Sequence, residues 1–157
     1  MRLCGTDNLE LVIGLTKRVS HRTFKHMKIV ADTSTFLAVA LEEAEKNWLI
    51  EVTEGKYLVA PPILPYEIAN ALSSLVRRQN LNRSQVDAVW DVATAIPVKL
   101  EPIDIRAALL LAAEYGIYAY DAFFLQCSIM TGFPLLTLDK GMKFVAEKLR
   151  IEMLVEK

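Results

Sequence analysis

Four acidic residues occupy positions where the sequence pattern ends a strand or opens a helix. Asp32 and Asp139 each follow a short apolar run typical of a buried strand. Asp121 opens an apolar helical segment, and Glu67 lies in the first turns of an amphipathic helix. Carboxylates brought together repel one another, and a divalent cation relieves that repulsion. Oxygen ligands alone suit Mg²⁺ or Mn²⁺, which can activate water against a phosphodiester bond.

Helix capping is the simpler interpretation of each aspartate taken singly, because a carboxylate before a helix accepts backbone N–H bonds. Capping does not account for Glu67, since glutamate is a poor capping residue. Nor is Asp32 needed as a cap, because Thr33 and Ser34 follow it and could each do that job. Capping alone therefore does not account for all four residues, and convergence of the four carboxylates on one site stays open beside it.

Other catalytic chemistries lack their side chains in the main part of the chain. Both histidines, His21 and His26, precede the first predicted strand. This excludes Ser-His-Asp, Cys-His and histidine-ligated metal mechanisms downstream of them. Cys4 and Cys127 cannot form a disulfide framework, and their sequence neighbourhoods hold no ligands at zinc-finger spacing.

The length of 157 residues fits one compact domain, with a boundary near Met27. The first 26 residues hold five basic and two acidic residues, which leaves 13 basic and 17 acidic residues in 27–157. We expect residues 1–26 to be an N-terminal extension, with the hypothesis that Met27 is the natural first residue. No apolar stretch reaches the roughly 20 residues that cross a bilayer, and no secretory signal is recognisable. We therefore place the protein in the cytoplasm, away from membranes.

From residue 27 onward, short apolar runs alternate with segments of helical periodicity, which predicts βαβ units, an α/β fold and a parallel sheet. Ligands bind such sheets beyond the carboxyl ends of the strands, where the aspartates fall. We expect two helices to begin at Ser84 and Asp104, and two to end at Gly116 and Gly132. Strands are predicted near 28–32, 57–60, 96–100, 135–138 and 151–155. Helices are predicted at 34–54 with a break, after Pro65, and at 83–94, 103–115, 121–131 and 140–149.

Four short motifs in order carry a family resemblance: IVADTSTFL from residue 29, PYEIANAL from 65, YDAFFLQC from 120 and LLTLDK from 135. The chain resembles the PIN-domain family, and most closely its VapC-like toxin ribonucleases. The resemblance covers essentially all of 27–157 and none of 1–26. Each motif is short, but four of them in the right order at the right spacing are fairly specific.

The resemblance implies a three-layer α/β/α sandwich with a central parallel sheet of about five strands. It also implies a magnesium-dependent endoribonuclease, frequent homodimers and an antitoxin partner that covers the site. The acidic positions of the family, which hold the metal and act in catalysis, fall on Asp32, Glu67, Asp121 and Asp139. Ser34 and Thr137 match positions where the family often has a supporting hydroxyl group. Cys127 stands where many members have alanine, so we interpret it as a packing residue.

Two other functions stay open. A strand that ends in aspartate is also the nucleophile position of phosphoaspartate phosphatases, although that pattern normally has a second aspartate where this chain has Ser34. A PIN-like binding module without turnover would keep the same acidic positions. Cleavage of RNA that requires Mg²⁺ would separate the three functions.

The surface offers few clear nucleic-acid signals, because the excess of acidic residues in 27–157 argues against broad electrostatic capture of RNA. Trp48 and Trp90 lie in apolar helical contexts and are expected in the core. Two basic clusters could contact phosphates, but solvated helix faces are the simpler interpretation of both. The clusters are Arg77, Arg78 and Arg83, and Lys140, Lys143 and Lys148.

Overall fold

The computed structural model describes residues 27–156. The extension expected at 1–26, with Cys4, His21 and His26, lies outside the described residues, so the boundary at Met27 stays a prediction. In the part of the chain that the structure describes, no single helix is long and apolar enough to cross a membrane. The helices Ile105–Tyr115 and Ala119–Thr131 are long and apolar enough only when taken together, and the chain bends by 117° between them.

The centre of the fold is a parallel sheet of four strands in the order β3-β2-β1-β4. This arrangement confirms the predicted α/β class with a parallel sheet. β1 lies inside the sheet with a neighbour on each side, so the residue that follows it is flanked by segments from both neighbours. The strands are β1 (Lys28–Ala31), β2 (Tyr57–Ala60), β3 (Val98–Leu100) and β4 (Leu135–Leu136).

The predicted strand at 151–155 is wrong as a full strand, since that segment makes only an isolated parallel bridge between Met153 and Leu135. β4 is also shorter than predicted, which leaves little edge for a fifth strand. Side-chain hydrogen bonds explain the early end of β4: the backbone N–H of Leu138 donates to the Ser34 hydroxyl at 2.9 Å, and that of Asp139 donates to the Thr137 hydroxyl at 3.0 Å.

The helices follow the predicted segments closely, including a break after the first of them. The α5 start is a correction: Asn82 caps it, and the side chains and backbone N–H groups of Asn82 and Gln85 form a reciprocal capping box, so Ser84 lies inside the first turn. Gly116 and Gly132 end their helices with φ of +66° and +68°, as glycine permits. The helices are α2 (Thr33–Ala40), α3 (Lys46–Thr53), α4 (Leu64–Arg77), α5 (Arg83–Ala95), α6 (Ile105–Tyr115), α7 (Ala119–Thr131) and α8 (Lys140–Lys148).

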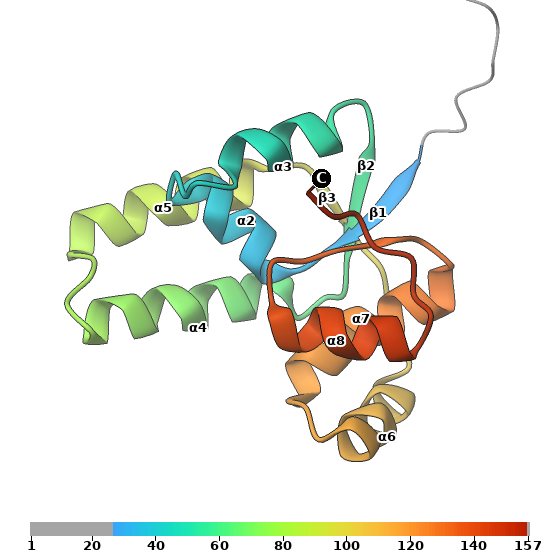
Figure 1. The fold of residues 1–157 in the computed structure, drawn as a ribbon. Helices are drawn as coiled ribbons and strands as arrows, with labels where there is room; N and C mark the ends of the chain where they lie inside the picture. Colours follow the sequence, from blue (N-terminus) through green and yellow to red (C-terminus); the bar gives the residue numbers. More distant parts are fainter. Residues whose placement is uncertain (1–26, 157) are drawn as a thin grey trace, which may run out of the picture.

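Helices cover both faces of the sheet, as the expected sandwich requires (Figure 1). Alternate residues of β1 show this: Ile29 packs with Ala38 and Leu49 of α2 and α3, whereas Val30 belongs to a larger cluster that includes Phe124 of α7. α4 and α5 form a hairpin that extends away from the sheet (Figure 1). The first turns of α2, α4 and α8 lie at the carboxyl edge of the sheet, because each of these helices follows the end of a strand.

Candidate active site

Asp32 follows β1 directly and is the most enclosed of the four carboxylates, with 3% of its surface exposed. Both of its carboxylate oxygens accept hydrogen bonds. Oδ1 accepts from the Ser34 hydroxyl at 2.6 Å and from the backbone N–H of Thr35 at 3.4 Å. Oδ2 accepts from the Thr137 hydroxyl at 2.8 Å. Asp32 therefore does cap α2, against our expectation that the neighbouring hydroxyl groups could replace it, and it does so while facing the acidic cluster.

Burial raises the pKa of the Asp32 carboxyl from its usual 3.8 to about 7. The hydrogen bonds from Ser34, Thr137 and Thr35 oppose the rise, and the negative charge of Glu67 adds to it. Hydroxyl donors thus compensate only part of the loss of water. A cation at this carboxylate would supply the missing stabilisation.

Glu67 lies in the first turn of α4 and accepts a hydrogen bond from the Thr33 hydroxyl. Partial burial raises the pKa of Glu67, the Thr33 hydroxyl lowers it, and the charge of Asp121 raises it further. The role of Thr33 is one that sequence reasoning missed. The only sequence feature that could have indicated this role is the position of Thr33 next to Asp32, and we had interpreted Thr33 as a possible helix cap.

Asp121 and Asp139 differ in how their helices use them. α7 begins at Ala119 with no side-chain cap, so Asp121 lies within its first turn and is not a cap. Asp139 does cap α8, where its Oδ1 accepts from the backbone N–H of Met142 at 2.6 Å. Burial raises the pKa of Asp121, and the charge of Asp139 raises it further.

The four carboxylates form a row of electrostatic neighbours. Asp32 is coupled to Glu67, Glu67 to Asp121, and Asp121 to Asp139. The strand order brings three of these residues to one edge of the sheet, because β2 leads toward Glu67 and β4 toward Asp139 on either side of β1, which Asp32 follows. Asp121 joins them from the first turn of α7. No basic side chain among the described residues forms an ion pair with any of the four. This acidic cluster of Asp32, Glu67, Asp121 and Asp139 is the candidate active site.

The donor chemistry of the acidic cluster fits a hard divalent cation, since every side chain offers oxygen and none is neutralised by a base. The positions of the four carboxylates fit a metal site less completely than their chemistry does. Within residues 27–156, no three acidic, histidine or cysteine side chains stand together as a group that could hold a metal ion. That the four carboxylates hold a divalent metal stays a prediction, and cation binding would require these side chains to close together.

Ser34 and Thr137, expected as supporting hydroxyl residues, join the two segments that carry Asp32 and Asp139. Each donates to Asp32 and accepts a backbone N–H from the β4–α8 connection, at Leu138 and Asp139 respectively. The two hydroxyl groups therefore fix the Asp32 carboxylate relative to the start of α8.

Cys127 and the two tryptophans lie where the sequence analysis placed them. Cys127 is fully buried, and burial raises the pKa of its thiol to about 11, so it stays a neutral packing group. Trp48 and Trp90 pack against the buried core. None of these side chains belongs to the acidic cluster.

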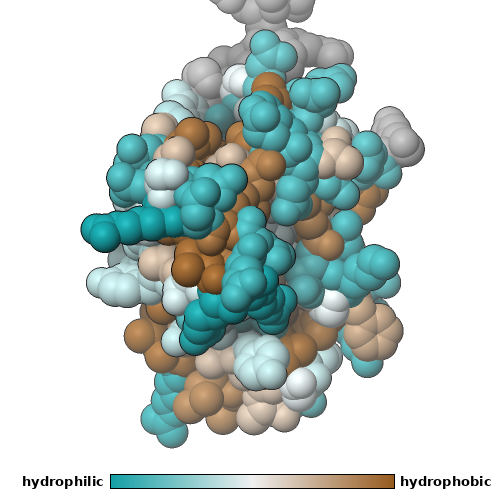
Figure 2. All heavy atoms as spheres, turned by 90° about the vertical axis from the view of Figure 1, so that its left-hand side faces the viewer, coloured by the Kyte–Doolittle hydropathy of each residue, from teal (hydrophilic) through white to brown (hydrophobic). Residues whose placement is uncertain are grey.

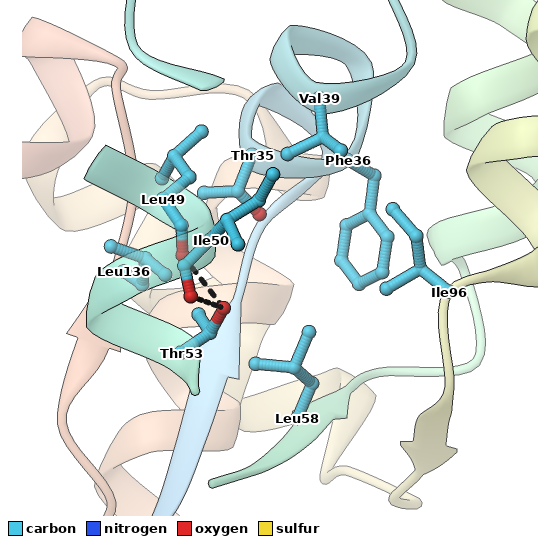
Figure 3. A pocket seen from close by; sticks show the side chains of 9 residues that line it. All are labelled: Thr35, Phe36, Val39, Leu49, Ile50, Thr53, Leu58, Ile96 and Leu136. Atoms are coloured by element: carbon cyan, nitrogen blue, oxygen red, sulfur yellow. Dashed lines mark hydrogen bonds between the residues drawn. The ribbon is translucent and has the colours of Figure 1, made fainter. Parts of the chain in front are cut away.

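An apolar cavity of about 160 Å³ lies between α2, α3 and the sheet, lined by Phe36, Leu49 and Ile96 among others (Figure 3). None of the four carboxylates lines it. Thr53 turns its hydroxyl back to the carbonyl oxygens of Leu49 and Ile50 within α3, so the cavity wall offers few free polar groups. This cavity is a packing feature apart from the acidic cluster.

Comparison with known proteins gives the family. A family model described as PIN domain matches residues 29–148, and the chain belongs to the PIN domain family. The match confirms the resemblance inferred from the four sequence motifs.

Individual relatives agree with that assignment. Ribonuclease VapC3 of Pyrobaculum aerophilum is 29% identical over 119 residues, which are 73% of this chain and 91% of the relative. The crystal structure of PAE2754 from Pyrobaculum aerophilum has a TM-score of 0.59 at 23% identity, over 76% of this chain and 86% of that one. The crystal structure of VapC20 of Mycobacterium tuberculosis, described as a Sarcin-Ricin loop cleaving toxin, has a TM-score of 0.54 at 13% identity, over 74% of this chain and 93% of that one. The two structures support the fold alone.

Proposed function

We propose that this protein is a metal-dependent endoribonuclease that hydrolyses RNA phosphodiester bonds at the acidic cluster. The observation that carries the proposal is the row of four neighbouring carboxylates, three of them with raised pKa values, that no basic side chain of the described residues neutralises. An enzyme keeps such a costly arrangement where the charge is needed for chemistry.

Asp32, Glu67, Asp121 and Asp139 are the residues that would hold Mg²⁺ or Mn²⁺. The bound cation would supply charge neutralisation at the scissile phosphate and an activated water. Asp32 contributes its charge in a fixed position, because Ser34 and Thr137 hold both of its oxygens. Thr33 orients Glu67 in the same way from the first turn of α2. The raised pKa values mean that these carboxyl groups must lose protons before they bind a cation.

The relatives support the choice of RNA as the substrate. The curated relative that is 29% identical is named a ribonuclease, and a protein of the same fold is described as a Sarcin-Ricin loop cleaving toxin. By this likeness we propose that the protein is the toxin of a toxin–antitoxin pair, acts in the cytoplasm, forms a homodimer and is inhibited by an antitoxin protein.

A PIN-like binding module without turnover is the second candidate. The observation that favours it is that no three described carboxylates form a ready metal-binding group. A phosphoaspartate phosphatase is less favoured, because the chain belongs to the PIN domain family and has Ser34 at the position of the second aspartate.

The deciding experiment incubates the purified protein with structured and unstructured RNAs in Mg²⁺, in Mn²⁺ and in excess chelator. We expect cleavage that the chelator abolishes and that Asp121→Asn loses. Asp104→Asn is the matched control, since Asp104 caps the exposed start of α6, away from the acidic cluster. Cleavage that survives the chelator would refute the metal-dependent mechanism, and RNA binding without any cleavage would favour the binding module.

A further inference from the structure

A groove of about 440 Å³ runs from the acidic cluster along the space between α2 and α4. Asp139 and Ser34, the hydroxyl partner of Asp32, line it where it meets the cluster. Arg78, the C-cap residue of α4, also lines it. The groove is therefore continuous with the candidate active site and reaches a basic residue that the proposed chemistry does not use.

One face of α4 sets the distance between Glu67, in the acidic cluster, and Arg78, at the other end of the groove. Glu67, Ala71, Ser74 and Arg78 follow one another at intervals of four, three and four residues, so they lie on one side of the helix. Eleven residues of α-helix span roughly 16 Å. Arg78 is too far from Glu67 to contact the same phosphate, but a bound strand that continues along the groove would bring a flanking phosphate to it.

The charges in the groove restrict how a strand can be held. Arg78 is exposed and, among the described residues, forms no ion pair. It is the only cation among the described residues that line the groove, whereas Glu43 and Asp139 bring negative charge. Attraction for phosphate is therefore concentrated at one guanidinium group, which binds phosphate oxygens in pairs.

The walls between the two ends are apolar. Leu37 comes from α2, Leu41 is the C-cap residue of that helix, and Leu75 comes from α4. The space-filling view from the side of the α4–α5 hairpin shows hydrophobic atoms exposed between hydrophilic side chains (Figure 2). Aliphatic walls of this kind contact the faces of bases, and bases expose their faces only in unpaired RNA.

We propose that this groove binds an unpaired RNA segment next to the cleaved bond, with Arg78 contacting a flanking phosphate and the leucine walls contacting a base. The proposal rests on the proposed function for the identity of the bound strand. Arg78 is a positioning residue for the substrate: it acts on binding and leaves the chemical step to the acidic cluster.

Binding is measured by fluorescence anisotropy of a labelled unpaired oligoribonucleotide, with Mg²⁺ present and in the Asp121→Asn background so that cleavage does not interfere. We expect Arg78→Gln to weaken binding roughly tenfold and to reduce the slope of log K against log salt by about 0.7, the value for one lost phosphate contact on a single strand. Arg77→Gln is the matched control, because Arg77 is exposed beside it but does not line the groove. Equal effects of the two substitutions would overturn the proposal.

A steric pair tests the walls without changing charge. Ser74 lines the groove, whereas its neighbour Ser73 is exposed outside it. We expect Ser74→Tyr to weaken binding at least tenfold and Ser73→Tyr to leave it within twofold, with equal melting temperatures for both variants. Tight binding by Ser74→Tyr, or binding of a duplex as tight as that of the unpaired strand, would overturn the proposal.

Cleavage assays of the same substitutions, made in the wild-type background, separate this proposal from the proposed function. In these steady-state cleavage assays, Arg78→Gln should raise KM with little change in kcat. If the wild type cleaves RNA but Arg78→Gln and Ser74→Tyr match their controls, the groove assignment is wrong and the nuclease stands. If no RNA is cleaved but binding depends on Arg78 and Ser74, the groove stands and the nuclease is wrong.

Discussion

The Thr137 hydroxyl donates to Asp32 Oδ2 at 2.8 Å across 105 positions of the chain, and Thr137 Oγ1 itself accepts the backbone N–H of Asp139 at 3.0 Å. One buried hydroxyl group thus ties two acidic residues of the candidate site together. Thr137→Val keeps the shape but leaves a buried carboxylate oxygen and an amide unsatisfied, so we expect a loss of about 1–3 kcal/mol in the free energy of unfolding. Urea unfolding of the wild type and the variant measures this change in the free energy of unfolding. Thr137→Ser, which keeps the hydroxyl, should recover most of the stability, and a stable Thr137→Val variant would contradict the bridging role.

The buried carboxyl of Asp32 makes stability depend on pH. The folded protein holds its proton up to about pH 7, whereas the unfolded chain releases it near 3.8. In the absence of divalent cations, the free energy of unfolding should therefore fall as pH rises from 4 to 7, by on the order of a few kcal/mol. Asp32→Asn should flatten this dependence and be more stable than the wild type above pH 7. Unfolding in urea at a series of pH values tests this, and a wild-type slope in Asp32→Asn would contradict it.

Asp121 separates catalysis from folding better than the capping aspartates, because it caps no helix. We expect Asp121→Asn to reduce RNA cleavage by several orders of magnitude, as loss of a metal ligand would, with an unchanged or slightly raised melting temperature since repulsion from Asp139 is relieved. Single-turnover cleavage assays and thermal unfolding measure the two effects. Full activity in this variant would remove Asp121 from the site.

Metal affinity should rise with pH between 6 and 8. The carboxyl groups of Asp32, Glu67 and Asp121 have raised pKa values, and bound protons compete with the cation. Titration calorimetry with Mg²⁺ or Mn²⁺ at the two pH values tests this. The cleavage rate should rise over the same pH range, with no step in the pH–rate profile caused by a histidine. A step near pH 6.5 that disappears on substitution of His21 or His26 would show that the assignment of the acidic cluster as the active site is wrong.

Gly141 controls the position of the Asp139 carboxylate, since a Cβ at this residue would lie 3.2 Å from Asp139 Oδ1. Gly141→Ala should gain about 1 kcal/mol of helix propensity and lose part of it to that contact. We expect near-wild-type stability with cleavage reduced severalfold, because the carboxylate must shift. Unchanged cleavage would mean that the position of Asp139 is not critical.

The sequence was sufficient to predict the alternation of strands and helices, since every helix and the first three strands have strong periodicity or clear terminal residues. It failed at 137–138 and 151–155, because the apolar composition of these segments does not reveal that side-chain hydroxyl groups take the backbone N–H groups of Leu138 and Asp139. Strand length here is decided by tertiary contacts that no local pattern records.

The site was predicted by residue type and order but not in its contacts. The neighbouring carboxylates follow from strand ends that share one edge of a parallel sheet. The partnership of Thr33 with Glu67 could not be predicted, since the two residues are 34 positions apart and Thr33 also suits a helix start. The pairing of Ser34 with Leu138 depends on how β1 and β4 stand side by side, which the motif order leaves open.

Because the strands are parallel, the four carboxylates all lie toward the carboxyl edge of the sheet, and among the described residues none of them lies at the opposite edge. The turn at 54–56 before β2 lies there, and Gly55, with φ of +69°, has open space where a side chain would point. A fluorescent label or a small inserted tag at this turn would be separated from the carboxylates by the length of β2. Such a reporter could follow the protein in the presence of RNA without lying at the acidic cluster.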